Sequence, residues 1–397
     1  MTVRADGREP GGIQPGETTA GSGNAVPAGA AAYSQQMVDN GGFPQSLALH
    51  DPRLQVPADR LRTLLSAAVE GELPDSYGDG GVVARLESRV AGLLGKEAAV
   101  VMPTGAMASQ VALRLHADAR DTRVVGFHPL AHVEVHERQG YSLVHQLVGR
   151  HLGGAERLIT LADLQSVTEP LAAVLWELPQ RDLGGLLPEW EDLVDQTSWV
   201  QATGAGTHLD GARLWEAQPY YARPHAEIAE LFDTVYVSLY KGLGGLAGGV
   251  LAGPAAFVAE AREWRARLGG QLYQAWPLAL AGEQGLDRHL PQMAAYWERA
   301  REIAAALRDV PGVEVVPEVP QTPLFHVRLD APVEALEAGH RELVDEGAPR
   351  LFLSARSSTD PAQSQFEVTI SERALALPVD EVRDAMVALL HRAQQHR

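Results

Sequence analysis

The chain has 397 residues, of which 33 are basic and 51 acidic, so its formal charge is −18. A charge of this sign opposes binding to nucleic-acid phosphates and anionic lipid surfaces, and we expect neither as a partner. The sequence contains no Cys, which excludes disulfides, thiolate nucleophiles and cysteine-based metal sites. It has no apolar run of about 18 residues and no signal-peptide core near its start, so we expect a cytoplasmic protein without a membrane span.

Three regions are expected along the chain. Residues 1–40, rich in Gly, Ala, Pro, Thr and Glu, are expected to form a disordered arm. Residues 41–288 alternate short apolar runs with longer amphipathic ones, which is typical of an α/β fold with a mostly parallel sheet flanked by helices. Residues 289–397 are expected to form a smaller α+β domain.

Hydrophobic periodicity predicts the elements of both ordered regions. In the first region, helices are predicted at Pro57–Val69, Val82–Leu94, Ala106–His116, Glu189–Gln196 and Ala255–Leu268. Buried strands are predicted there at Ala98–Met102, Arg123–Phe127, Leu158–Leu161, Ala172–Trp176, Thr207–Leu209, Thr234–Leu239 and Gly249–Ala252. In the second region, helices are predicted at Gln292–Arg308, Val333–Asp345 and Val379–Gln394, with strands near Leu324–Leu329, Leu351–Ser354 and Phe366–Ile370.

Lysine is rare in this chain. It occurs only at Lys96 and Lys241, so 31 of the 33 basic residues are Arg. An ε-amine can lose its proton and attack a carbonyl, whereas a guanidinium stays protonated, so a surviving Lys indicates a place where Arg cannot substitute. Lys241 follows the apolar run TVYVSLY and precedes GLGGLAGG. A partly desolvated turn of this kind favours a lowered pKa and covalent chemistry with an aldehyde; the alternative is a surface lysine at a strand end.

Other chemical groups also follow predicted strands, at the edge of a parallel sheet where ligands bind. The turn Thr104–Ala106 leads into a helix whose N-terminus could hold an anion, unless Thr104 serves only as an N-cap. Asp210 could accept a hydrogen bond from a protonated ring and Arg213 could bind a carboxylate; alternatively the two form an internal ion pair. His132 could stack on a ring or act as a base, or be a solvated loop residue.

Two further patterns are rejected as sites. The Gly-rich run at 242–247 resembles a dinucleotide fingerprint, but it precedes a strand where the fingerprint needs a helix. His128, His132 and His136 have the spacing of zinc ligands on a helix. Because Pro129 and β-branched neighbours disfavour a regular helix there, no metal site is predicted. The remaining turns together suit pyridoxal 5'-phosphate, which has a phosphate, a ring nitrogen, a flat ring and an aldehyde.

Four segments resemble the threonine aldolase/β-eliminating lyase family of fold-type I pyridoxal-phosphate enzymes. They are YGDGGVVARLE, GKEAAVVMPTGAMASQVAL, HLDGARLWEA and LYKGLGGLAGGVLAG, and the resemblance runs from about residue 77 to about residue 285. It implies a fold-type I transferase-like architecture. It also implies a homodimer or homotetramer with active sites at the subunit interface.

The resemblance implies specific roles at the cofactor. Lys241 is implied to hold the cofactor covalently, Asp210 to pair with its ring nitrogen, and His132 to stack on the ring and assist proton transfer. The phosphate cradle is implied to consist of Thr104, Gly105 and the Ala106 amide.

The resemblance also implies residues around the substrate. Arg213 is implied to bind the substrate carboxylate, with His208 and Glu177 lining the site. Tyr77 is implied to lie near the active site of the same or a neighbouring subunit. A late arginine of the family has no clear match here, and the candidates that could complete the carboxylate site are Arg181, Arg356 and Arg373.

The predicted function is cleavage of the Cα–Cβ bond of a β-hydroxy-α-amino acid such as threonine, giving glycine and an aldehyde. The same cofactor chemistry allows β-elimination, transamination or racemisation, and a product assay separates these. The family's usual Thr after PTG is Ala106 here, and its usual ENTH reads Glu177-Leu178-Pro179-Gln180. The altered loop favours the other cofactor reactions, whereas the lost phosphate hydroxyl and the missing late arginine leave a non-catalytic binding protein on the same fold as a further alternative.

Overall fold

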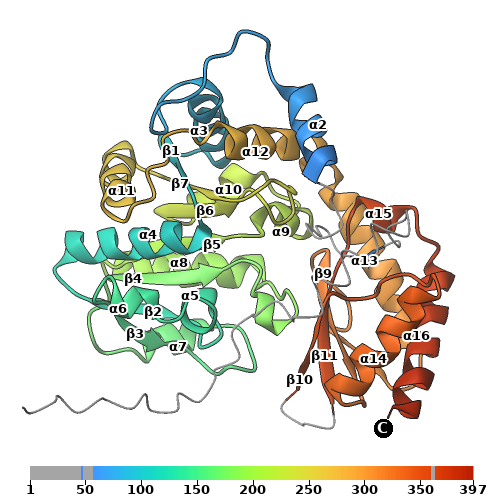
Figure 1. Ribbon diagram of the computed structural model, residues 1–397. Helices are drawn as coiled ribbons and strands as arrows, with labels where there is room; N and C mark the ends of the chain where they lie inside the picture. Colours follow the sequence, from blue (N-terminus) through green and yellow to red (C-terminus); the bar gives the residue numbers. More distant parts are fainter. Residues whose placement is uncertain (1–45, 48–56, 359–362, 397) are drawn as a thin grey trace, which may run out of the picture. The chain divides into compact units, whose positions relative to one another are not determined.

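The computed structural model describes residues 46–47, 57–358 and 363–396. The predicted disordered arm at 1–40 lies outside the described residues. The larger part of the described chain is built on a seven-stranded sheet with the order β1-β7-β6-β5-β4-β2-β3 (Figure 1). The strands are β1 (Ala98–Met102), β2 (Val124–Phe127), β3 (Val148–His151), β4 (Ala173–Glu177), β5 (Gly206–Gly211), β6 (Thr234–Ser238) and β7 (Gly249–Gly253).

The sheet is mostly parallel, as predicted. Strands β3, β2, β4, β5 and β6 pair in parallel, and β7 pairs antiparallel with both β6 and β1. Strand β1 therefore runs in the same direction as β6. Within this seven-stranded sheet, the carboxyl ends of the six strands other than β7 lie at the same edge. The apolar runs of β4, β5 and β6 are almost wholly buried, which is typical of strands covered on both faces.

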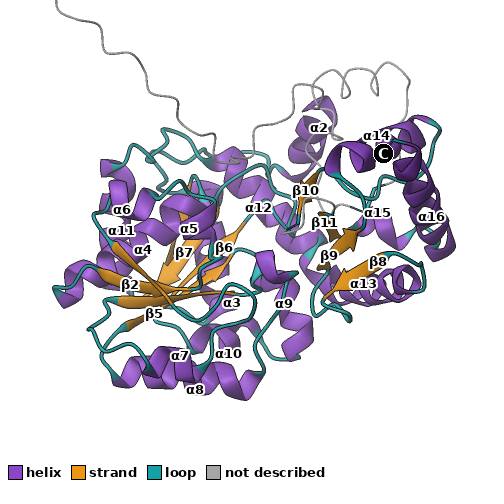
Figure 2. Cartoon of the chain, turned by 90° about the horizontal axis from the view of Figure 1, so that it is seen from below, coloured by secondary structure: helices purple, strands orange, loops and turns teal. Residues whose placement is uncertain are grey.

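Helices cover both faces of this sheet (Figure 2). One face carries α4 (Gly105–Arg120), α5 (His132–Val135), α6 (Gly140–Leu143) and α11 (Ala255–Arg267). The other face carries α3 (Gly81–Leu94), α7 (Leu161–Gln165), α8 (Trp190–Ala202), α9 (Leu214–Tyr221) and α10 (His225–Glu230). The remaining helices before residue 293 are α2 (Pro57–Ala67), α12 (Trp276–Arg288) and the short 3-10 turns η2 (Arg181–Leu183) and η3 (Leu290–Gln292).

A second, antiparallel sheet follows in the sequence. Its order is β10-β11-β9-β8, from β8 (Val313–Val316), β9 (Leu324–Leu329), β10 (Ala355–Ser357) and β11 (Ser364–Thr369). Helices α13 (Met293–Arg308), α14 (Val333–Asp345), α15 (Glu372–Leu375) and α16 (Val379–Gln395) accompany it. This is the α+β texture expected after residue 288, and the domain boundaries themselves stay predictions.

Two predicted strands are wrong. Leu158–Leu161 is irregular up to the start of α7, because Thr160 and Asp163 form a capping box that begins that helix. Leu351–Ser354 precedes a strand, and the pairing starts only at Ala355 in β10. Strands β3 and β8 were not predicted, and both carry more exposed side chains than the central strands.

The loop before α3 adopts a backbone that its glycines permit. Gly78 has φ of 90° and Gly81 has φ of 55°, the left-handed region that glycine enters without a steric penalty. Asp75 is buried at the base of this loop and accepts hydrogen bonds from the backbone N–H groups of Gly78, Ala275 and Trp276 at 2.8–3.0 Å. One carboxylate therefore holds the loop against the N-terminus of α12.

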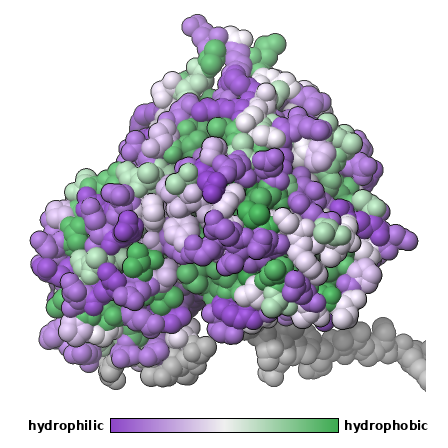
Figure 3. Space-filling view, turned by 180° about the vertical axis from the view of Figure 1, so that it is seen from behind, coloured by the Kyte–Doolittle hydropathy of each residue, from purple (hydrophilic) through white to green (hydrophobic). Residues whose placement is uncertain are grey.

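The described helices include none that is both long and apolar enough to cross a membrane. Figure 3 shows one face of the molecule, on which hydrophilic residues cover large areas and hydrophobic residues form smaller patches between them. Such a mixture is ordinary for a folded protein surface.

The Asp75→Ala variant should be less stable, because three buried N–H groups lose a charged acceptor. We expect the free energy of unfolding to fall by about 2–4 kcal/mol, measured by urea denaturation. Asp79→Ala, which removes an exposed carboxylate from the same loop, is the matched control and should change stability little. Equal stability of the two variants would contradict this role for Asp75.

Candidate active site

The carboxyl ends of neighbouring parallel strands bring the predicted catalytic groups together. Glu177 is the last residue of β4 and pairs in register with Asp210 on β5, which in turn pairs with Tyr236 on β6. Lys241 follows β6 in a turn where the Ser238 hydroxyl accepts the backbone N–H of Lys241 at 3.3 Å. The strand order therefore places an amine and two carboxyl groups at one edge of the sheet.

The environment of Lys241 favours its neutral amine. Burial, and after it the nearby Arg213 guanidinium, lower its pKa from 10.5 to about 8, although Asp210 and Glu177 oppose the shift. Removing a cation from water disfavours its charged form. At pH near 8 a large fraction of this side chain is thus the nucleophilic free amine.

Asp210 and Glu177 are buried acids beside one another. Burial is the main cause that raises the pKa of each, and the charge of Asp210 raises that of Glu177 further. Asp210 accepts the backbone N–H of Ala212 at 3.1 Å. Glu177 accepts three hydrogen bonds from the loops around it, namely from the backbone N–H of His132 (3.0 Å) and Arg181 (3.2 Å) and from the Gln180 side chain (3.3 Å).

His132 is held in place by a carboxylate that the sequence analysis missed. Its Nδ1 lies 2.8 Å from Oε1 of Glu137, whose side chain is almost fully buried and also accepts a hydrogen bond from Gln110 at 2.7 Å. Burial by itself lowers the pKa of His132, but the hydrogen bond with Glu137 and the charge of Asp210 raise it overall. Glu137 looks like one acid among many in the sequence, so only the fold reveals this pair.

The predicted phosphate cradle lies at the N-terminus of α4. Thr104 is the N-cap, and its hydroxyl accepts the backbone N–H of Met107 at 3.2 Å. Gly105 has no room for a side chain, since an added Cβ would lie 1.9 Å from the Tyr236 hydroxyl. Gly105 and Ala106 begin the first turn, where backbone N–H groups lack helical partners and the helix dipole favours an anion. These residues fit a phosphate.

Two arginines converge on one carboxylate from the second sheet. Arg181 donates from Nε to Glu367 on β11 at 2.6 Å, and Arg213 donates from NH2 to the same carboxylate at 3.3 Å. Burial raises the pKa of Glu367, but the two arginines overcome that and set it at about 2. The structure thus brings Arg181 beside Arg213, whereas Arg356 pairs with Asp182 at 3.0 Å. Sequence reasoning had not singled out Glu367.

Two predicted site residues have their contacts elsewhere. His208 is fully buried and its Nδ1 lies 2.9 Å from the Thr234 hydroxyl, beneath α4. Tyr77 is half exposed and its ring packs edge-to-face against Tyr273, with ring centroids 5.3 Å apart. In the described chain, no hydrogen bond or ring contact joins His208 or Tyr77 to Lys241 or Asp210.

Each of the three histidines considered as metal ligands has a partner of its own, and the rings of His132 and His136 also lie 5.2 Å apart. A single helical turn, α5, does form at His132–Val135 despite the β-branched residues. His128 contacts the carbonyl oxygen of Arg157 at 2.8 Å, and His136 pairs with Asp182 at 2.6 Å. The absence of a metal site stays a prediction, and the described residues contain no group of three or more side chains that could hold a metal ion.

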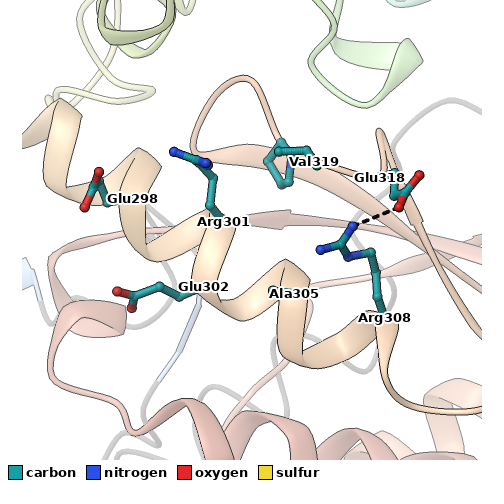
Figure 4. A pocket seen from close by; sticks show the side chains of 8 residues that line it. Glu298, Arg301, Glu302, Ala305, Arg308, Glu318 and Val319 are labelled. Atoms are coloured by element: carbon teal, nitrogen blue, oxygen red, sulfur yellow. Dashed lines mark hydrogen bonds and ion pairs between the residues drawn. The ribbon is translucent and has the colours of Figure 1, made fainter.

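A surface groove of about 320 Å³ lies apart from these residues, between α13 and the segment that follows β8 (Figure 4). Charged side chains of both signs surround it, and Arg308 pairs with Glu318 across one end at 2.9 Å. Three glutamates and two arginines line the groove, and it shares no residue with the strand-end group.

Comparisons with known proteins agree with this geometry. The family model described as beta-eliminating lyase matches residues 54–330. The low specificity L-threonine aldolase of Saccharomyces cerevisiae is 30% identical over 54% of this chain, and the alignment spans 58% of that enzyme's length. A crystal structure of a candidate L-allo-threonine aldolase from Listeria monocytogenes is 35% identical, with a TM-score of 0.84, over 92% of this chain and 99% of its own.

A more distant structure shows the fold alone. Serine palmitoyltransferase from S. paucimobilis, solved with bound pyridoxal phosphate and myriocin, has a TM-score of 0.64 at 14% identity. It covers 93% of this chain and 97% of its own. The predicted fold-type I architecture is therefore confirmed.

The lowered pKa of Lys241 can be tested with protein freed of cofactor. The rate of its reaction with pyridoxal phosphate, followed by absorbance, should rise about tenfold per pH unit and level off above pH of about 8. Lys241→Ala, which leaves Lys96 in place, should lose the borohydride-fixed adduct seen by mass spectrometry. A rate that still climbs at pH 10 would mean an ordinary lysine.

Proposed function

The chain belongs to the beta-eliminating lyase family, and from that premise we propose that it is a pyridoxal-phosphate-dependent aldehyde-lyase of the threonine aldolase type. It cleaves the Cα–Cβ bond of a β-hydroxy-α-amino acid into glycine and an aldehyde. The observation that carries the proposal is the partly buried Lys241 amine, with its lowered pKa, at the same sheet edge as Asp210 and Glu177.

The residues present fit the family's cofactor. Lys241 would supply the amine that bonds to its aldehyde, and Asp210 would pair with its ring nitrogen. Gly105 and Ala106 at the start of α4 would hold the phosphate, and His132 would stack on the ring. When bound, pyridoxal phosphate delocalises the electron pair left on Cα when the bond breaks.

The arginines bind the substrate. Arg213 offers its guanidinium to the α-carboxylate, with Arg181 beside it, and both already bind a carboxylate, that of Glu367. Guanidinium groups suit such planar, paired contacts. The substrate's carboxylate therefore binds beside two guanidinium groups that already bind one carboxylate.

His132 accepts the proton of the β-hydroxyl. The electron pair of the O–H bond forms the second bond of the new carbonyl group. The Cα–Cβ bond breaks at the same time, and its electrons remain on Cα, which later takes a proton to give glycine. Glu137 orients the ring through its contact with Nδ1 and stabilises the imidazolium that forms.

The enzyme works as a homodimer or homotetramer with active sites at the subunit interface. Exposed apolar side chains surround α2 and the loops that follow it, which is typical of an interaction surface: Leu61 (66% exposed), Leu65 (75%), Leu73 (79%) and Tyr273 (64%). Tyr77, which lies with Tyr273 and away from Lys241 of its own chain, serves the site of the second copy.

Aldehyde release tests the reaction. The purified protein with pyridoxal phosphate should convert threonine, allo-threonine or phenylserine into equimolar glycine and aldehyde. Lys241→Ala should abolish turnover, and Asp210→Asn should lower kcat on the order of 100-fold or more. An α-keto acid without aldehyde would instead indicate β-elimination or transamination, the second candidate, which the family's description and the altered loop after β4 favour.

Subunit complementation tests the shared site. Tyr77→Ala and Lys241→Ala, each impaired alone, should regain activity when mixed and allowed to exchange subunits, since some sites then combine an intact Lys241 with an intact Tyr77. Light scattering gives the oligomeric state in parallel. Mixtures no more active than the average of their components would remove Tyr77 from the partner's site.

A further inference from the structure

The chain holds a buried carboxyl group that the proposed reaction does not use. Glu216 lies in the first turn of α9 and is 0% exposed. Among the described residues, neither of its carboxyl oxygens has a hydrogen-bond partner of normal geometry, although the nearby backbone N–H of Gly242 lowers its pKa. Its Oε2 lies 3.7 Å from Nε of Arg213, and that nitrogen is also buried without a hydrogen-bond partner.

Glu216 faces the turn that carries Lys241. A Cβ added at Gly242 would lie 2.7 Å from Glu216 Oε1, so glycine at 242 leaves the space that the carboxyl group occupies. The charged groups that face Glu216 are Arg213 before its own helix, Lys241 after β6, and Glu367 on β11. The side chain of Met293, on α13, also borders this space, since a Cβ added at Gly242 would lie 3.1 Å from its terminal methyl group.

Burial is the main cause that raises the pKa of Glu216 to about 7. Arg213 and Lys241 lower the pKa, and Glu367 raises it. A carboxyl group with such a pKa changes its charge within the physiological range, unlike Glu367, which the two arginines keep ionised.

The charges of Arg181, Arg213, Glu367 and Glu216, here called the arginine corner, explain why the protonation state of Glu216 matters. With Lys241 in its neutral form, Arg181 and Arg213 contribute two positive charges, and Glu367 contributes one negative charge shared between them. If Glu216 is ionised, the corner is neutral and offers no net attraction to a further carboxylate. If Glu216 is protonated, one positive charge remains. Because uncompensated buried charge is costly, the number of carboxylates bound and the protonation of Glu216 must be linked.

We propose that Glu216 takes up a proton from solvent when the α-carboxylate of an amino acid binds to Arg213. The corner is then neutral both with and without substrate. The Nε and NH2 groups of Arg213 lie 3.7 Å from Glu216 and 3.3 Å from Glu367, so in this proposal the incoming carboxylate binds to the remaining NH1 group. This inference rests on the proposed function, because it takes Arg213 as the carboxylate ligand. Glu216 acts through Arg213 and is a positioning residue.

Proton uptake on glycine binding tests the proposal directly. The holoenzyme is titrated with glycine by calorimetry near pH of about 8 in two buffers of different ionisation enthalpy. The wild type should take up more protons than Glu216→Gln, with a difference that approaches one. The wild type's dissociation constant for glycine, relative to that of the variant, should rise up to about tenfold per pH unit above pH of about 7.

Two further variants complete the design. Glu216→Asp keeps an ionisable carboxyl group at this position and should retain the uptake. Glu227→Gln, which neutralises an acid of the next helix that pairs with Arg223, should behave as the wild type. If Glu216→Gln does not fold, the wild type alone decides, because its uptake should be smaller near pH of about 5.5, where Glu216 already holds a proton, than near pH of about 8.

The outcomes separate the two proposals. Glycine binding with equal uptake in wild type and Glu216→Gln, or uptake in the wild type that does not change with pH, would overturn the role of Glu216 alone. A wild-type holoenzyme whose cofactor absorbance responds to no amino acid would overturn the proposed function, and the inference with it.

Discussion

Burial of charged groups where parallel strands end is the constraint on which the site depends. Burial lowers the pKa of Lys241 and raises the pKa values of Asp210, Glu177 and Glu216. These shifts have one cause, since every group that loses water favours its neutral form unless an opposite charge lies beside it. The fold thereby produces a nucleophilic amine and several weak acids from ordinary side chains.

Ion pairs link this edge of the large sheet to the second sheet. Glu367 on β11 accepts hydrogen bonds from both Arg181 and Arg213. Arg356 on β10 donates a hydrogen bond to Asp182 in the turn that follows β4. The two pairs of Glu367 are partly withdrawn from solvent, which makes them less sensitive to salt than surface pairs, whereas the side chain of Arg356 is about half exposed. A carboxylate that binds at Arg213 therefore enters a contact that also joins the two sheets, and substrate binding and the packing of the second sheet share the same guanidinium groups.

The sequence was sufficient for the parts of the fold with strong local signals. The apolar run of β1 and the amphipathic repeats of α14 were predicted to the residue, because each follows from the spacing of apolar side chains. Strand β3 was missed since its residues, VGRH, are mostly exposed and lack an apolar run. The segment at Leu158–Leu161 was misassigned because its apolar residues pack in an irregular segment before a capped helix.

The residues of the candidate site also fall into those that the sequence predicts and those that only the fold identifies. Lys241, Asp210, His132 and Arg213 could be proposed from the sequence because each follows a predicted strand, and parallel strands end at one edge. Glu137 and Glu367, which contact His132 and Arg213, could not be proposed from the sequence. Arg213 and Glu367 are 154 positions apart, and their contact requires the second sheet to pack against the first.

The scarcity of lysine was informative only in combination with position. Lys96 is also partly buried, and burial lowers its pKa too, but its amine donates to the carbonyl oxygen of Phe232 at 2.5 Å and has no strand-end carboxyl group in register beside it. Desolvation makes an amine reactive, whereas the neighbouring carboxylates and arginines decide what it reacts with. The glutamates are therefore as informative about this site as the lysine. They are harder to recognise in a sequence because 51 acidic residues look alike until the fold removes a few of them from water.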